Sequence, residues 1–85
     1  MHAVYVVRNN VSREIYIGYT TDLKARLMRH NARGQKFTTR KLGTWEYAYV
    51  ELYRSEKDAR IRERKLKSHG SSKHELLKRL KNSVL

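Results

Sequence analysis

Two short runs of β-branched and aromatic residues near the N-terminus constrain the fold most strongly. The first covers residues 3–7 (Ala-Val-Tyr-Val-Val) and the second covers residues 15–18 (Ile-Tyr-Ile-Gly). The polar residues 9–12 between them are typical of a hairpin loop, so we expect the two runs to pair as strands. If the loop is symmetric about its centre, Tyr5 lies directly across the ladder from Tyr16, and both phenols project from one face.

A third strand is predicted over residues 45–53, where side chains of two kinds alternate. In a regular strand, one face carries Ala48, Val50 and Leu52, and the other carries Trp45, Tyr47, Tyr49 and Tyr53. Apolar or aromatic residues on both faces indicate a strand that is covered on both sides. The aromatic row either stacks nucleic-acid bases or packs under a helix, and the sequence leaves both open.

Three helices are predicted from their capping residues. Residues 20–22 (Thr-Thr-Asp) each suit an N-cap, and the helix after them runs to about Ala32. Ser55 with Asp58 resembles a capping box for a second helix, which should end near Gly70. Ser72 with Glu75 repeats that signal for a third helix over about 72–82. The order ββαβαα gives an α+β fold with a three-stranded sheet, and residues 1–85 are expected to form one domain.

The charge balance favours a polyanionic partner. The chain has 20 lysines and arginines against 8 aspartates and glutamates, a formal net charge of +12. Such a positive field attracts nucleic acid, and binding through it should weaken steeply with salt. Charge alone does not separate this reading from association with ribosomes, binding to an anionic membrane surface, or solubility.

Composition also excludes several classes. There is no cysteine, which excludes a disulfide framework and a thiolate zinc site. No apolar run approaches the roughly 20 residues of a membrane span, and the N-terminus lacks the apolar core of a signal peptide. We therefore expect a cytoplasmic protein without a membrane partner.

The two tyrosines, with the glycine that follows the second, are the first candidates for chemistry. Tyrosine is common in strands, so a structural role is the simpler explanation for either residue alone. A phenol becomes a useful base only where nearby positive charge lowers its pKa, and this chain is rich in such charge. Strand propensity does not explain the glycine at position 18. Glycine in a strand often marks the close approach of a ligand or another backbone.

Arg26 and His30 lie on the face of the first helix that should be buried. They share the i, i+3, i+4, i+7 spacing of Leu23 and Leu27. Arg26 either snorkels at a solvated rim or holds a scissile phosphate. His30, one turn later, either plays a structural part or contacts the phosphate or the nucleophile.

Glu63 is the strongest candidate for a functional residue in the second helix. It shares a stripe with Ala59 and Leu66, and a carboxylate on a buried side should be paired or bind a metal. Lys67, four residues on, is suitably placed for a salt bridge. Alternatively, one carboxylate together with phosphate oxygens and water is a usual way to hold Mg²⁺.

A basic stretch covers the first helix and the loop after it. Each residue alone is a solvated charge, but together they form a plausible track for a phosphate backbone. The candidate nucleic-acid-binding residues are Gly18, Lys24, Arg29, Arg33, Lys36, Thr38, Arg40 and Lys41.

As an ordered set, these residues resemble the GIY-YIG nuclease family, in particular its small stand-alone bacterial members. The resemblance rests on residues 3–5 (Ala-Val-Tyr), residues 16–18 (Tyr-Ile-Gly), Arg26, His30 and Glu63, and it covers about residues 2–70. It implies a three-stranded antiparallel sheet flanked by helices. It also implies metal-dependent hydrolysis of a phosphodiester, with Mg²⁺ or Mn²⁺ as the cofactor.

The resemblance also implies a role for each catalytic candidate. Tyr5 would be the general base for the attacking water, and Tyr16 would support it or position the water. Arg26 would bind the phosphate, and His30 would assist near the nucleophile. Glu63 would be the sole protein ligand of the metal.

Two departures from the family pattern bear on activity and specificity. Ala3 stands where the first motif has its glycine, which leaves Tyr5 in place. No separate DNA-recognition domain is evident, so we expect weak sequence specificity or selection by DNA structure. The expected function is therefore a DNA endonuclease that prefers DNA to RNA and acts as a monomer. DNA repair, recombination and defence against mobile elements all fit it. The alternative is a nucleic-acid-binding module without useful turnover, which acts with repair or ribosomal partners.

Overall fold

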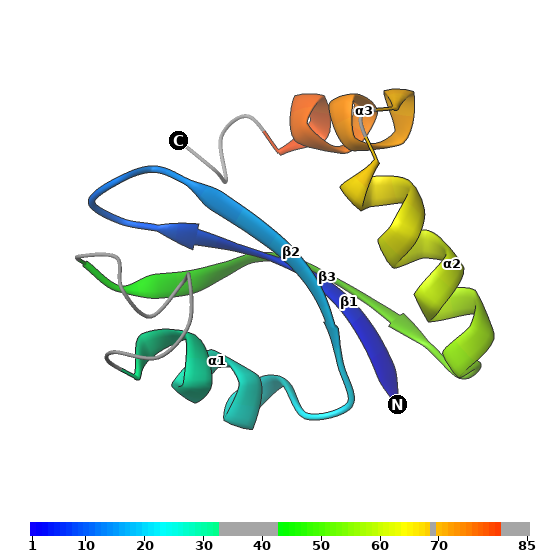
Figure 1. Ribbon diagram of the computed structural model, residues 1–85, viewed down its shortest axis with the longest axis horizontal. Coiled ribbons are helices and arrows are strands. Elements are labelled where there is room, and N and C mark those ends of the chain that lie inside the picture. Colours follow the sequence, from blue (N-terminus) through cyan, green and yellow to red (C-terminus); the bar gives the residue numbers. More distant parts are fainter. Residues whose placement is uncertain (33–42, 69, 81–85) are drawn as a thin grey trace.

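The computed structural model describes residues 1–32, 43–68 and 70–80, and these form three strands and three helices (Figure 1). The order of the elements is ββαβαα, which confirms the predicted α+β class. In chain order they are β1 (His2–Asn9), β2 (Ile15–Thr20), α1 (Leu23–Asn31), β3 (Trp45–Tyr53), α2 (Glu56–Lys67) and α3 (Ser71–Arg79).

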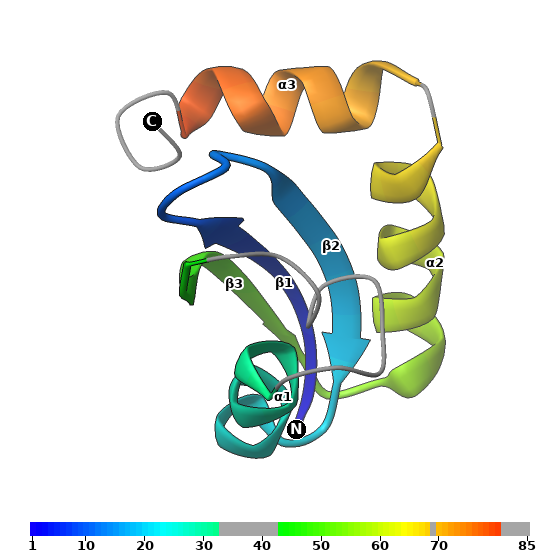
Figure 2. The ribbon, with the colours of Figure 1, turned by 60° about the vertical axis from the view of Figure 1, so that its left-hand side comes forward.

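The sheet is antiparallel, and β1 is its central strand. The strand order is β2-β1-β3, so β2 and β3 form the two edges. Helix α1 covers one face, whereas α2 and α3 cover the other (Figures 1 and 2). Because both faces are covered, residues 3–7 of β1 are all buried, which explains their continuous apolar run.

The β1–β2 hairpin has a different register from the one predicted. Tyr5 pairs with Gly18, and Tyr16 pairs with Val7, so the two tyrosines are not directly opposite. The prediction placed the centre of the loop between residues 10 and 11. In the structure Asn9 still belongs to β1, and its side-chain oxygen accepts hydrogen bonds from two loop amides at 2.9 Å each. The centre therefore moves by one residue, and both phenols still project from the same face.

The predicted division of β3 into two faces is also wrong at one point. Val6 pairs with Tyr49 but its neighbour Val7 pairs with Tyr47, so Ala48 is an extra residue in a β-bulge. The bulge reverses the alternation. Trp45, Tyr47 and Val50 pack on the α1 face, and Ala48, Tyr49 and Tyr53 pack on the α2 face. The aromatic row is thus split between two faces, and its members pack against helices on both.

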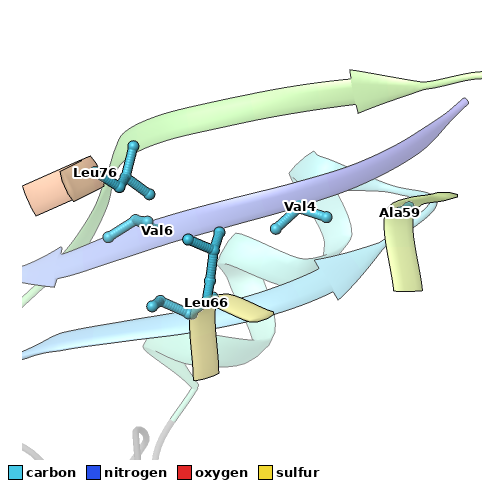
Figure 3. Packing of buried hydrophobic residues seen from close by; sticks show 6 residues of the cluster. Val4, Val6, Ala59, Leu66 and Leu76 are labelled. Carbon is cyan, nitrogen blue, oxygen red and sulfur yellow. The ribbon is translucent and has the colours of Figure 1, made fainter. Parts of the chain in front are cut away.

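The larger core lies between the sheet and the pair α2 and α3. Val4 and Val6 project from β1 toward Ala59 and Leu66 of α2 and Leu76 of α3 (Figure 3). Each of these five side chains is at most 2% exposed. Full burial of one such leucine stabilises a fold by about 1.5–3 kcal/mol, so Leu76 anchors α3 firmly.

The helix boundaries follow the predicted caps in two of three cases. Asp22 caps α1 by accepting from Ala25 N–H at 3.0 Å, and Ser55 caps α2 by accepting from Asp58 N–H at 3.3 Å. Helix α2 ends at Lys67, before Gly70, and α3 begins earlier than predicted. Gly70 is its N-cap, without a side-chain hydrogen bond, so Ser72 lies inside the helix. The predicted end of α3, at about residue 82, lies outside the described residues.

A carboxylate in β3 ties α2 to the sheet. Arg62 donates two hydrogen bonds to Glu51, from Nε and Nη2, both at 2.9 Å. The hydroxyls of Tyr49 and Tyr53 donate to the same carboxylate at 2.6 and 2.7 Å. Burial by itself would raise the pKa of Glu51, but these donors outweigh it and hold that pKa below its usual value.

Glu51→Gln should therefore destabilise the fold and change its response to acid. We expect a loss of about 1–3 kcal/mol in unfolding free energy at neutral pH, because Arg62 loses its charged partner. In the parent chain the lowered pKa means that this stabilisation is present above about pH 4.5 and is lost as pH falls through the folded-state value. Thermal unfolding from pH 7 to pH 3 should show a smaller decline for the variant. An equal decline in stability of parent and variant between pH 7 and pH 3 would contradict the stabilising role assigned to the Glu51 carboxylate.

None of the helices in the described residues is both long enough and apolar enough to span a membrane.

Candidate active site

The side chain of Tyr5 lies at the centre of the α1 face of the sheet. It is 0% exposed, and its hydroxyl shares a hydrogen bond of 2.8 Å with Nε2 of His30 on α1. His30 is 6% exposed and stands at the end of the helical stripe that also carries Leu23 and Leu27. The spacing that placed His30 on the inner face therefore delivers an imidazole to the phenol of the central strand.

Gly18 creates the space that Tyr5 occupies. A Cβ atom at Gly18 would lie 2.4 Å from the Tyr5 hydroxyl oxygen and 2.5 Å from its Cζ. Real Cβ atoms essentially never approach another heavy atom so closely. Gly18 was expected to mark the close approach of a ligand or another backbone; in the structure the approaching group is instead the side-chain ring of Tyr5 on the neighbouring strand.

Arg26 and Tyr47 complete the surroundings of Tyr5. The Tyr47 ring meets the Tyr5 ring edge-on with centroids 5.5 Å apart, and its hydroxyl donates to the carbonyl of Leu23 at the start of α1. Burial raises the pKa of Tyr5 to about 12, although the neighbouring Arg26 guanidinium acts in the opposite direction. At neutral pH Tyr5 therefore keeps its proton, rather than existing as a free phenolate.

Tyr16 lies on the other side of His30. Their rings are edge-to-face with centroids 5.2 Å apart, and Tyr16 is partly exposed where Tyr5 is not. Trp45 lies behind the imidazole, 6.1 Å between centroids. Asn31, the residue after His30, accepts from Trp45 N–H at 2.7 Å and donates to Trp45 C=O at 3.2 Å. These two bonds fix the end of α1 on β3 and hold His30 in place.

Glu63 lies on α2, apart from this cluster. Its carboxylate forms a salt bridge of 2.9 Å with Lys67 and a longer one of 3.7 Å with Arg60. The side chain is 13% exposed. Lys67 also lies over the ring of Tyr16, with Nζ 5.6 Å from its centroid. The salt bridge that the sequence allowed is thus present, and Lys67 connects Glu63 to the outer side of Tyr16.

The donor set around Glu63 fits a metal held mainly by substrate and water. In the part of the chain that the structure describes, no three His, Cys, Asp or Glu side chains come together as a metal cage. Mg²⁺ commonly takes one or two carboxylates and completes its shell with phosphate oxygens and water. Glu63, largely shielded from solvent and flanked by cations, can supply that one carboxylate.

The sequence matches a known family. A model of the GIY-YIG catalytic domain matches residues 1–81. The chain belongs to the GIY-YIG family. Similar proteins include a UPF0213 protein of Staphylococcus epidermidis, 35% identical over 69 residues, which are 80% of this chain and 82% of that protein. A UPF0213 protein of Staphylococcus haemolyticus is 35% identical over 68 residues, 79% of this chain and 80% of its own length. No solved structure matches significantly.

The two GIY-YIG motifs lie next to each other on β1 and β2. Ala3 replaces the first glycine of the motif, and it is 1% exposed and pairs with Thr20. The alanine methyl is thus accommodated in the core, and Tyr5 keeps its position two residues later. The second motif supplies Tyr16 on the α1 face and Gly18 beneath Tyr5.

The described residues include only some of the predicted nucleic-acid-binding residues. Lys24 and Arg29 are exposed on α1, whereas Gly18 is buried under Tyr5. The other candidates, Arg33, Lys36, Thr38, Arg40 and Lys41, lie outside the described residues.

Sequence reasoning missed two contributors to this site. Tyr47 was assigned only to the aromatic row, because the bulge that turns it toward Tyr5 leaves no mark in the residue pattern. Asn31 received no role, although a polar side chain at the last position of a buried helical stripe is a usable signal for a tertiary hydrogen bond.

Proposed function

We propose that this protein is a metal-dependent endonuclease that hydrolyses phosphodiester bonds in DNA, with weak sequence specificity or selection by DNA structure. The observation that supports this most is the cluster on the α1 face. It joins a buried tyrosine–histidine pair at 2.8 Å to an arginine and to a second, partly exposed tyrosine. The net charge of +12 suits a polyanionic substrate.

Arg26 binds the scissile phosphate in this proposal. Its guanidinium is fixed beside the phenol of Tyr5 and is partly exposed, so it can meet a substrate without rearrangement. A planar guanidinium matches two phosphate oxygens and stabilises the charge that develops on them in the transition state.

Tyr5 and His30 act as one acid–base unit. A phenol with a pKa of about 12 is a poor base by itself, but it can take a proton from water while passing its own to Nε2 of His30. No free phenolate then has to form. Tyr5 has no exposed surface, so this step requires that substrate binding admit the attacking water to its hydroxyl, while the partly exposed Tyr16 positions that water from the solvent side.

Glu63 is the residue that would hold the divalent cation, Mg²⁺ or Mn²⁺. When bound, such a cation supplies positive charge to the scissile phosphate and to the leaving oxygen. Lys67 and Arg60, which neutralise the Glu63 carboxylate in its absence, are placed to turn toward substrate phosphates.

Glu63→Gln tests the proposal directly. The parent and the variant are incubated with labelled single-stranded, duplex and branched DNA, with Mg²⁺, with Mn²⁺, and with a chelator. We expect metal-dependent cleavage by the parent and a loss of about a hundredfold or more in the variant, with DNA binding retained. Glu75→Gln, an exposed acid on α3, is the matched control and should cleave normally.

The alternative function is a nucleic-acid-binding module that acts with repair or ribosomal partners and does not cleave. The ion pairs of Glu63 with Lys67 and Arg60 favour it, since they give the carboxylate a structural use without metal. Binding without cleavage on every substrate and with either metal would decide for this alternative.

A further inference from the structure

A cavity at the outer edge of β2 stands beside the catalytic cluster but does not belong to it. We call it the edge pocket. Its volume is about 350 Å³, and it is lined by Ile15, Tyr16, Ile17, Lys67 and Lys73. In Figure 2, α2 runs beside β2 and α3 crosses near the hairpin end of the sheet, so the pocket draws its lysines from both helices.

The walls of the edge pocket combine two kinds of chemistry. Ile15 and Ile17 pack on the α2 face of β2 and Tyr16 packs on its α1 face, and Lys67 and Lys73 add the charged groups at this edge. Among the described residues that line it there is no carboxylate. An aromatic ring beside flexible cations is the usual combination for a base and its phosphate in single-stranded nucleic acid.

Tyr16 connects the edge pocket to the catalytic cluster. One part of its ring meets His30 edge-to-face at 5.2 Å, and Lys67 lies over the ring at 5.6 Å. Lys67 in turn pairs with the proposed metal ligand Glu63 at 2.9 Å. A ligand in the edge pocket is therefore separated from His30 only by Tyr16, and from Glu63 only by Lys67.

We propose that the edge pocket binds the nucleotide next to the phosphodiester that is cut. Its base or sugar would lie along the edge of β2 at residues 15–17, and its phosphate would lie between Lys67 and Lys73. This inference rests on the proposed function. The volume is at the lower end of small-ligand pockets and suits a single nucleotide, so we expect the strand to be locally unpaired there.

In this proposal α3 contributes to substrate binding as well as to the hydrophobic core. Leu76 fixes it against the sheet at 2% exposure, and Lys73, one turn earlier, is held at the rim of the pocket. Selection for frayed, gapped or branched DNA would follow from this arrangement, since an unpaired nucleotide reaches the pocket and a stacked one does not.

The test is a titration of the protein with the 5′-phosphorylated dinucleotide pTpT without metal, followed by backbone NMR. We expect saturable shifts at residues 15–17 and at Lys73. Lys73→Ala should weaken binding by about threefold to fivefold, as for the loss of one exposed ion pair. Lys78→Ala, an exposed lysine on the same helix, is the matched control and should bind like the parent.

Cleavage assays separate this inference from the proposed function. Binding of pTpT in the pocket with no cleavage of any substrate would refute the nuclease and leave the nucleotide site standing. Cleavage without shifts at residues 15–17, or equal effects of Lys73→Ala and Lys78→Ala, would overturn the edge pocket. So would shifts of the same residues by an extended acidic peptide but not by pTpT, which would indicate a protein partner at the β2 edge.

Discussion

Replacing Arg26 with alanine should lower the rate of DNA cleavage by about a hundredfold to a thousandfold while leaving the protein folded. The guanidinium is partly exposed beside Tyr5 and Tyr47, where it offers positive charge to a phosphate at the mouth of a buried cluster. Its loss also removes the influence that opposes burial, so the pKa of Tyr5 should rise further and proton transfer should slow. The measurement is the single-turnover rate at saturating DNA.

Two further variants define what Arg26 contributes. Arg26→Lys keeps the charge but not the planar pair of donors, so an intermediate rate is expected. Arg29→Ala removes an exposed charge one turn later on α1 and should mainly weaken DNA binding. A cleavage rate for Arg26→Ala equal to that of Arg29→Ala would exclude Arg26 from the catalytic site.

Gly18→Ala should damage both stability and cleavage. The added methyl would stand 2.4 Å from the Tyr5 oxygen, and the Tyr5 ring is fully buried, so ring or strand must move. Overpacking of this kind costs about 1–3 kcal/mol. Any shift of the ring also lengthens the 2.8 Å hydrogen bond to His30, and we expect cleavage to fall by more than the folded fraction does. Chemical denaturation and single-turnover cleavage measure the two effects.

Gly70→Ala is the control for this prediction. A Cβ there would have its nearest neighbour, the Ser68 hydroxyl oxygen, at 3.4 Å, so the change meets little resistance. It replaces the N-cap glycine of α3 with the poorer N-cap alanine, so stability should fall by about 0.5–1 kcal/mol while cleavage stays unchanged. If Gly18→Ala resembled Gly70→Ala in both measurements, the proposed fit between Gly18 and Tyr5 would be wrong.

The order of the elements was predictable because each has a local signal. Asp22 and Ser55 cap their helices as their side chains suggest, and the β-branched runs form strands. The register of the hairpin was not predictable, because it depends on how the side chain of Asn9 binds the loop amides. The cap of α3 was misjudged because two serines and a glycine compete for one position.

The site was predictable as a set of residues but not as a geometry. Helical spacing alone placed Arg26 and His30 on the inner face of α1, where both meet Tyr5. The orientation of Tyr47 relative to Tyr49 depends on the bulge at Ala48, which arises from the pairing of β3 with β1. Lys73 reaches the edge pocket only through the packing of α3. Neither has a signature in the neighbouring sequence, because both are set by contacts between distant segments.

The bulge at Ala48 has a consequence for how the chain length of β3 can vary. Without Ala48, Tyr47 would be followed directly by Tyr49, and each could keep its present partner in β1. A one-residue deletion at this point would therefore preserve Tyr47 on the α1 face and Tyr49 in the Glu51 network. The same deletion two residues later would invert every side chain on one side of it. Position 48 is thus the place in β3 where a one-residue deletion can be absorbed.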